Sequence, residues 1–293
     1  MSRAVTLPSI GVVVLSMGNR PVELAEAVGS ALAQEGVELD VLVVGNGWDP
    51  VGLPDGARGI GLPDNLGIPE GRNVGAARVH GDVIFFLDDD AVIPSTTALR
   101  TMAERFARRP SLGMAQALLT TTDGSEPPGR WVRRLRKGDP TRSSRIFSVT
   151  EGVTAVRRDA FEAAGGWAGE FFYAHEGIEL AWRVWDQGLE VWHMGDVEMH
   201  HPATDPSRHA VSQRLNGRNR VWLARRNLPV VLRPLYLGTW TAVQVLRDRS
   251  DLPALRIWFA GVREGFANDP GDVRIISWRT VVRMTAYGRP PVI

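Results

Sequence analysis

Three consecutive carboxylates, Asp88, Asp89 and Asp90, directly follow the apolar residues 84–87. Such a short apolar run is typical of a buried strand in a parallel sheet, and open α/β sheets bind ligands beyond the carboxyl ends of their strands. Three adjacent carboxylates repel one another unless a cation neutralises them, and oxygen ligands suit Mg²⁺ or Mn²⁺. Because alternate residues of an extended segment point the same way, we predict that Asp88 and Asp90 hold a divalent cation while Asp89 faces elsewhere. The alternative is a solvated acidic turn.

A second pair of carboxylates, Glu176 and Glu179, lies in a segment with helical spacing. Together with Arg183 they occupy positions i, i+3 and i+7, which share one face of a helix. This pattern alone fits a surface ladder of ion pairs. The aromatic residues 171–173 precede it, however, and would bury the start of the helix.

The elements that must position these side chains follow from the hydrophobic pattern. Short runs rich in apolar residues predict strands, and apolar residues at helical spacing predict helices. The predicted strands cover residues 10–15, 41–44, 83–87, 147–156 and 191–201. One predicted helix begins at Pro21, and the others cover residues 71–79, 97–108, 157–164 and 176–187. Their alternation predicts an α/β fold with an open, mostly parallel sheet flanked by helices.

Composition narrows the class of protein. The 293 residues suit one large domain, or one domain with a small appendage, and 44% hydrophobic with 23% charged residues is ordinary for a globular protein. A net charge of +1 does not favour a nucleic-acid partner. The absence of cysteine excludes disulfides and cysteine-bound metals. No signal peptide or long apolar stretch is recognisable, so we expect a cytoplasmic protein.

Two segments depart from the alternating pattern. Residues 121–145 combine prolines and glycine with basic residues, which predicts a mobile basic loop, either simply solvated or acting as a lid or anion-binding patch. Residues 229–293 contain Trp240, Trp258 and Trp278 among arginines and predict a helical appendage. Such helices suit packing, a homo-oligomer interface or peripheral contact with the inner face of the cell membrane.

An ordered set of motifs resembles family 2 glycosyltransferases with the GT-A fold, and most closely their bacterial rhamnosyltransferase-type members. The acidic triplet resembles the D-x-D region of that family. Further matching segments, in the family's order, are residues 12–16 with 19–21, residues 65–67 with 71–75, residues 157–161 with 165–167, and residues 218–220. The resemblance covers roughly residues 8–228, so we predict a catalytic domain over 1–228, with a donor half to about 120 and an acceptor half from about 146.

The resemblance implies a metal-dependent transfer of a sugar from a nucleoside-diphosphate sugar to an acceptor hydroxyl, with Mn²⁺ or Mg²⁺ as cofactor. The family commonly has an aspartate before Asn46, where this chain has Gly45. A uridine or thymidine donor (UDP- or dTDP-linked) is favoured only by analogy. The residues predicted to contact the donor are Ser16, Arg20, Asn46, Asp49, Asp64, Arg72 and Asp89.

The catalytic base is where the chain departs most from the family. An aspartate that often acts as base in inverting members is replaced by Gly177. We therefore predict Glu176 as the base, with Glu179 second. The resemblance implies an inverting course, but a retaining one stays open, because Glu-x-x-Glu also resembles a motif of retaining GT-A enzymes. The resemblance further implies that His200, with His201 adjacent, completes the metal site.

The acceptor is predicted only by class: a glycan, a lipid-linked sugar or a natural product, in cell-surface or natural-product glycosylation. Two alternatives remain from the sequence. The glycines at positions 45 and 177 suit a degenerate nucleotide-sugar-binding module without turnover. A nucleotidyltransferase also uses an α/β sheet, Mg²⁺ and carboxylates, but the segment 16–20 has too few glycines for the phosphate loop that such an enzyme would carry.

Overall fold

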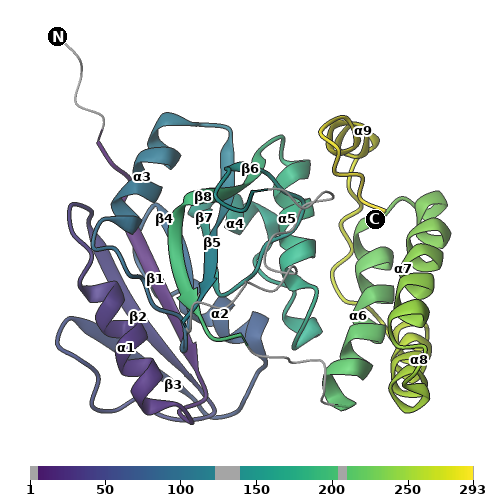
Figure 1. Ribbon diagram of the computed structural model, residues 1–293, viewed down its shortest axis with the longest axis horizontal. Helices are drawn as coiled ribbons and strands as arrows, with labels where there is room; N and C mark the ends of the chain where they lie inside the picture. The colour runs from purple at the N-terminus through teal and green to yellow at the C-terminus, as the bar shows by residue number, and fades with distance from the viewer. Residues whose placement is uncertain (1–5, 123–138, 204–209, 293) are drawn as a thin grey trace.

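The computed structural model describes residues 6–122, 139–203 and 210–292, and its centre is a twisted mixed sheet (Figure 1). Within these residues the sheet has eight strands in the order β3-β2-β1-β4-β7-β5-β8-β6. The strands are β1 (Ile10–Ser16), β2 (Leu39–Asn46), β3 (Ala57–Leu62), β4 (Val83–Asp88), β5 (Leu112–Thr121), β6 (Ser144–Arg145), β7 (Val153–Arg157) and β8 (Glu190–His201).

Strand direction brings six strand ends to one edge of this sheet. β1 runs parallel to β2 and β4, and β2 runs parallel to β3. β7 is antiparallel to both β4 and β5, so the direction reverses twice and β5 again runs with β4. β8 is parallel to β5. The carboxyl ends of β1 to β5 and of β8 therefore lie along the same edge, where α/β proteins bind ligands.

Helices cover both faces of the sheet, as the sequence pattern predicts. They are α1 (Pro21–Leu32), α2 (Ile68–Ala76), α3 (Ala98–Arg108), α4 (Arg158–Ala164), α5 (Glu176–Asp186), α6 (Ala210–Asn227), α7 (Arg233–Arg247), α8 (Leu252–Ala267) and α9 (Trp278–Ala286), with 3₁₀ turns η2 (Gly169–Phe171) and η4 (Val230–Leu232). Alternate residues of β1 enter different cores: Val12 and Val14 pack with α1 and α3, and Val13 packs with α2, α4 and α5.

Two strands and one boundary differ from the sequence prediction. β3 and β5 were not predicted, because β3 is glycine-rich and half exposed, and the apolar run of β5 is interrupted by the buried polar Gln116. The strand predicted over 147–156 is present only from Val153. Before it the chain turns, and the N–H of Thr150 donates to the Gln116 side chain at 2.7 Å instead of to a neighbouring strand.

The C-terminal region is helical, and α8 packs closely on α6 (Figure 1). Glycines permit this approach: a Cβ at Gly217 would lie 2.2 Å from the carbonyl oxygen of Trp258, and one at Gly261 would lie 1.9 Å from that of Arg214. Any side chain at these positions would push the two helices apart. No helix among the described residues is long and apolar enough to span a membrane.

The predicted basic loop lies largely outside the described residues. Its last part forms β6, where Arg145 donates to Glu190 at 2.9 Å and lies over the Trp192 ring. Arg145 is therefore committed to packing the edge of the sheet.

Candidate active site

Asp88, Asp90 and His201 form a compact group at the ligand-binding edge of the sheet. One ligand atom from each lies within 4.8 Å of the others. The Nε2 of His201 is 3.5 Å from Asp88 Oδ2 and 3.2 Å from Asp90 Oδ1. Two carboxylates and one imidazole suit a borderline-hard divalent cation such as Mn²⁺. The donor set thus fits the cofactor that the sequence predicts.

The histidine in this group is His201, whereas the sequence favoured His200. The backbones of Val92 and His200 exchange two hydrogen bonds of 2.9 Å each, which ties the end of β8 to the chain after β4. Adjacent strand residues point to opposite sides, so His201 faces the aspartates while His200 lies 3.3 Å from Glu198. The register between β5 and β8 shifts after Ala117, which no sequence pattern predicts, and this shift sets the direction in which His201 points.

Cationic side chains already compensate the two carboxylates. Arg72, which is buried, donates to Asp88 Oδ1 at 2.6 Å, and Arg20 pairs with Asp90. Burial alone would raise the pKa of Asp88, but Arg72 and His201 outweigh it and hold that pKa at about 2. Burial likewise opposes the charged form of His201, yet both aspartates raise its pKa to about 10. The two aspartates therefore favour positively charged groups at this site.

Asp89 is not part of this group: β4 ends at Asp88, and residues 89–90 form a turn in which the N–H of Ala91 donates to the carbonyl of Asp88 at 3.1 Å. Burial raises the pKa of Asp89, a hydrogen bond from Ser16 lowers it, and the charges of Asp90 and Asp88 raise it further. Ser16 ends β1, is buried, and also accepts a hydrogen bond from the N–H of Gly18 at 3.0 Å. Asp89 and Ser16 together fix the loop that follows β1.

The remaining predicted donor residues lie at the same edge, but they differ in availability. The side chain of Asn46 holds the 65–67 loop, donating to Asn65 and Gly67 and accepting from the N–H of Leu66 at 2.8 Å. Its amide is therefore committed to the protein. Asp49 and Asp64 are exposed on the loops after β2 and β3.

Trp48, which the sequence did not single out, also shapes this end. Its indole N–H donates to the carbonyl of Ser16 at 2.8 Å, and its ring covers Gly18, which has a φ of +72°. A side chain at Gly18 would collide with that ring.

Glu176 stands at the start of α5 and is almost fully buried. Its Oε2 has no hydrogen-bond partner among the described residues. Burial and the charge of Glu151 raise the pKa of Glu176 to about 8, and Asp88 adds to the increase. The carboxyl group is therefore close to the metal group, and it is largely protonated at neutral pH.

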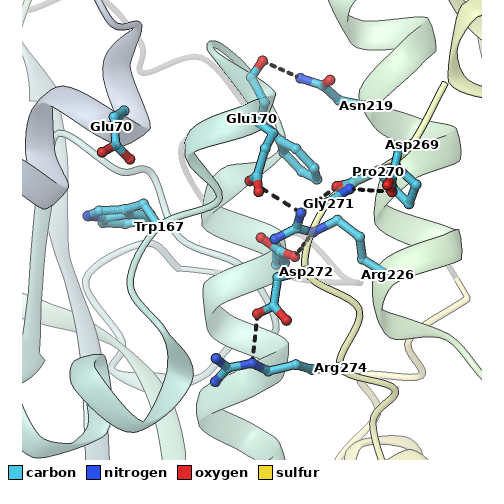
Figure 2. A network of polar contacts seen from close by, with 12 residues as sticks. Glu70, Trp167, Glu170, Asn219, Arg226, Asp269, Pro270, Gly271, Asp272 and Arg274 are labelled. Carbon is cyan, nitrogen blue, oxygen red and sulfur yellow. Dashed lines mark hydrogen bonds and ion pairs between the residues drawn. The ribbon is translucent and has the colours of Figure 1, made fainter.

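Glu179, the second predicted base, lies in a different environment. Its carboxylate is 1% exposed and accepts hydrogen bonds from Arg183 at 2.8 Å, from Arg226 and from Asn227 at 3.2 Å. Figure 2 shows Arg226 reaching onward to Glu170 and to the carbonyl of Pro270. The structure thus places Glu179 in an interior ion-pair network and does not bring it to the metal group.

The loop that leads into α5 has an unusual backbone. Phe172, Ala174 and His175 have φ values of 62°, 71° and 74°, which side-chain-bearing residues rarely adopt. The amide of the fully buried Asn219 donates to the carbonyls of Phe171, Tyr173 and Ala174 at 2.7–3.0 Å; Figure 2 shows Asn219 reaching this loop. The late Arg-Asn-Arg motif therefore holds the backbone that delivers Glu176.

The family assignment agrees with this geometry. The chain belongs to glycosyl transferase family 2, whose model matches residues 12–165, just over half of the sequence. It has the GT-A fold that the sequence motifs imply. Among curated proteins, none matches the sequence.

Solved structures share the fold at low sequence identity. GalNAc-T7 with UDP, GalNAc and Mn²⁺ superposes with a TM-score of 0.64 at 14% identity, over 97% of this chain and 55% of that one. Staphylococcus aureus TarS 1–349 with UDP-GlcNAc superposes with a TM-score of 0.62 at 13% identity, over 94% of this chain and 83% of that one. The mannosyltransferase PcManGT from Pyrobaculum calidifontis, with GDP-Man and Mn²⁺, superposes with a TM-score of 0.56 at 14% identity, over 98% of this chain and 78% of that one. The chain thus spans little more than half the length of GalNAc-T7.

Proposed function

We propose that the chain transfers a sugar from a nucleoside-diphosphate sugar to an acceptor hydroxyl in a single inverting displacement that depends on a divalent cation. The observation that carries the proposal is the group of Asp88, Asp90 and His201 at the ligand-binding edge of the sheet. A family 2 sequence match and relatives solved with UDP-GlcNAc or GDP-Man and Mn²⁺ support the same donor chemistry.

The chain's own residues supply the other parts of the reaction. Asp88, Asp90 and His201 would hold the cation, which when bound offsets negative charge on the departing diphosphate. Arg20, whose side chain is 43% exposed, is the cation best able to leave its aspartate and contact a phosphate. Asp49, Asp64 and Asp89 surround the neighbouring strand ends and remain candidates for contacting the donor. A uridine or thymidine donor stays favoured by analogy.

The environment of Glu179 favours inversion over retention. A retaining double displacement would use a carboxylate positioned against the sugar, and Glu179 is enclosed by Arg183, Arg226 and Asn227. An inverting displacement needs one carboxylate to accept the proton of the acceptor hydroxyl. Carboxyl groups near the start of α5 meet that need, and they include Glu176.

The C-terminal helices support an acceptor presented at the inner face of the cell membrane, such as a lipid-linked sugar, more than a free glycan or natural product. Apolar side chains on η4, α7 and α8 are exposed, and arginines lie among them. They are Val230, Val231, Leu235, Leu246, Leu252 and Phe266, with Arg247 and Arg256 nearby. Exposed apolar and basic side chains on helices suit contact with an anionic membrane, and they would also suit a homo-oligomer.

A donor panel tests the proposal. Purified protein is incubated with Mn²⁺ and UDP-, dTDP- or GDP-linked sugars plus glycan and lipid-linked acceptors, and release of the nucleoside diphosphate is measured with and without EDTA. The proposal predicts turnover that EDTA abolishes and Mn²⁺ restores. Nucleotide binding without turnover from any donor would contradict it and favour a binding module. Pyrophosphate release from a nucleoside triphosphate would favour a nucleotidyltransferase.

A further inference from the structure

The carboxylate of Glu151 occupies the space beside Gly177 at the start of α5. The N–H of Gly177 donates to Glu151 Oε1 at 2.9 Å. A Cβ at position 177 would lie 2.2 Å from the same oxygen and 2.6 Å from the carbonyl oxygen of Val149. No side chain at position 177 is compatible with this arrangement. The glycine and the glutamate therefore form one local structure.

Glu151 also lies close to the metal group. Its neighbour Gly152 accepts a hydrogen bond from the N–H of Asp88 at 2.9 Å. The backbone of Gly152 is packed so tightly on Asp88 that a Cβ there would lie 1.8 Å from Asp88 Oδ2. The turn that carries Glu151 is thus held against one of the three predicted cation ligands, at the edge of the sheet where the donor would bind.

Glu151 lies at the start of α5, where a substrate can reach it more easily than it can reach Glu176. Gly177 is the second residue of α5, so its N–H has no partner within the helix, and the helix start carries partial positive charge. Glu151 is only partly buried, whereas Glu176 is 3% exposed. Burial and the charge of Glu151 raise the pKa of Glu176 to about 8.

We propose that Glu151, and not Glu176, is the general base that accepts the proton of the acceptor hydroxyl, with Gly177 as the glycine that makes room for it. This inference rests on the proposed function. As the acceptor oxygen forms its bond to the anomeric carbon, the bond from that carbon to the diphosphate oxygen breaks and its electron pair leaves with the diphosphate. The acceptor O–H bond breaks, and its proton passes to Oε2 of Glu151, since Oε1 is held by Gly177.

The first test is Glu151→Gln, in which the amide oxygen can still accept the hydrogen bond from Gly177. With the best donor and acceptor of the panel above, kcat should fall by about 10²- to 10⁴-fold, the usual effect of losing a general base. Binding of UDP with Mn²⁺, measured by calorimetry, should stay within about twofold. The exposed Glu162→Gln is the matched control and should keep wild-type kcat.

A second variant guards against a purely structural effect. Glu151→Ala leaves a space beside Gly177, and added formate, a small carboxylate, should restore part of the lost rate in proportion to its concentration. Formate should not accelerate the wild type or Glu162→Ala. Glu176→Gln should lower kcat less than Glu151→Gln does.

The outcomes separate the two proposals. Wild-type transfer with less than a tenfold loss in Glu151→Gln would overturn the base assignment and leave the proposed function standing. So would a loss confined to Glu176→Gln, or a lack of formate rescue in a Glu151→Ala protein that still binds UDP and Mn²⁺. A wild type that releases nucleotide from no donor would overturn the proposed function, and with it the base assignment.

Discussion

The side-chain amide of Asn73 forms a reciprocal pair of hydrogen bonds with the backbone of Trp167. Its Nδ2 donates to the carbonyl of Trp167 at 2.9 Å, and its Oδ1 accepts from the N–H of Trp167 at 2.8 Å. The amide thus satisfies both polar groups of a buried peptide, as a neighbouring strand would. Trp167 in turn lies beside Arg72, the partner of Asp88. The pair joins the donor-side helix α2 to the turn after α4.

Replacing Asn73 by alanine should therefore cost stability well beyond an average surface substitution. Two backbone groups would lose their partners, which predicts a loss of about 2–4 kcal/mol in the free energy of unfolding. Urea denaturation measures it, with the exposed Asn268→Ala as control. A loss below about 1 kcal/mol would show that water or a neighbouring group replaces the amide.

The two adjacent histidines should behave differently toward metal. His201→Ala should weaken Mn²⁺ binding by about tenfold or more, because it removes one of three ligands, while His200→Ala should leave the affinity nearly unchanged. Titration of Mn²⁺ followed by electron paramagnetic resonance measures both. If the larger loss occurs in His200→Ala, the orientation of the end of β8 is wrong.

Asp90→Asn should separate metal dependence from folding. Arg20 can be hydrated when released, but Asp90 is buried and also faces His201, so the variant should lose about 1–3 kcal/mol of stability and stay folded. Turnover, in contrast, should fall by about 10²-fold or more, because the cation loses a charged ligand. Activity against Mn²⁺ concentration is the measurement, and exposed Asp55→Asn is the control. Unchanged turnover would remove Asp90 from the metal group.

The raised pKa of Glu176 predicts a stability that falls with pH. The folded value, about 8, exceeds the ordinary value of 4.5, so the folded state holds the proton more tightly. The stabilisation is complete below pH 4.5 and is lost as pH rises through 8. Glutamine cannot ionise. Between pH 5 and pH 9 the free energy of unfolding of Glu176→Gln should therefore rise by a few kcal/mol relative to that of the wild type. Urea unfolding at several pH values tests this, and Glu162→Gln should show no such gain.

The strained loop before α5 offers a stabilising substitution. Ala174 has a φ of 71°, where glycine carries no steric penalty. Ala174→Gly should raise the free energy of unfolding by roughly 1 kcal/mol, whereas Ala224→Gly within α6 should lower it by a similar amount. Thermal unfolding of the two variants compares them. Destabilisation by Ala174→Gly would mean that the positive φ carries no strain.

Much of the fold was predictable because the strands of the donor half are continuous apolar runs. The two flanking cores follow from strand alternation, whereas Asp88 and Asp90 are brought together by the turn at the end of β4. β3 and β5 were not predicted, since β3 is half exposed and glycine-rich, and the apolar run of β5 is interrupted by the polar Gln116. The C-terminal helices were predictable as helices, but their close contact through glycines was not.

The sequence predicted the aspartates of the site, but it did not predict which histidine joins them or which carboxyl group lies beside Gly177. Choosing between His200 and His201 depends on an irregular register between β5 and β8, which only the three-dimensional pairing shows. Glu179 matched a catalytic spacing, yet Arg226, 47 residues later, encloses it. Glu151 had no motif to mark it. Its signal was Gly177 itself, whose missing side chain meant that another group could fill the space.

The contacts of Arg226 also limit where the chain can be joined to that of a relative in a chimeric protein. This nearly fully buried guanidinium joins Glu179 in α5 to the carbonyl of Pro270, and the backbone of Arg226 accepts the N–H of Arg274 at 2.9 Å. A chimera that takes its C-terminal helices from a relative would split this cluster if the junction fell just after α6. A junction that keeps residues 268–276 with their native catalytic half would let acceptor-side helices be exchanged without unseating the start of α5.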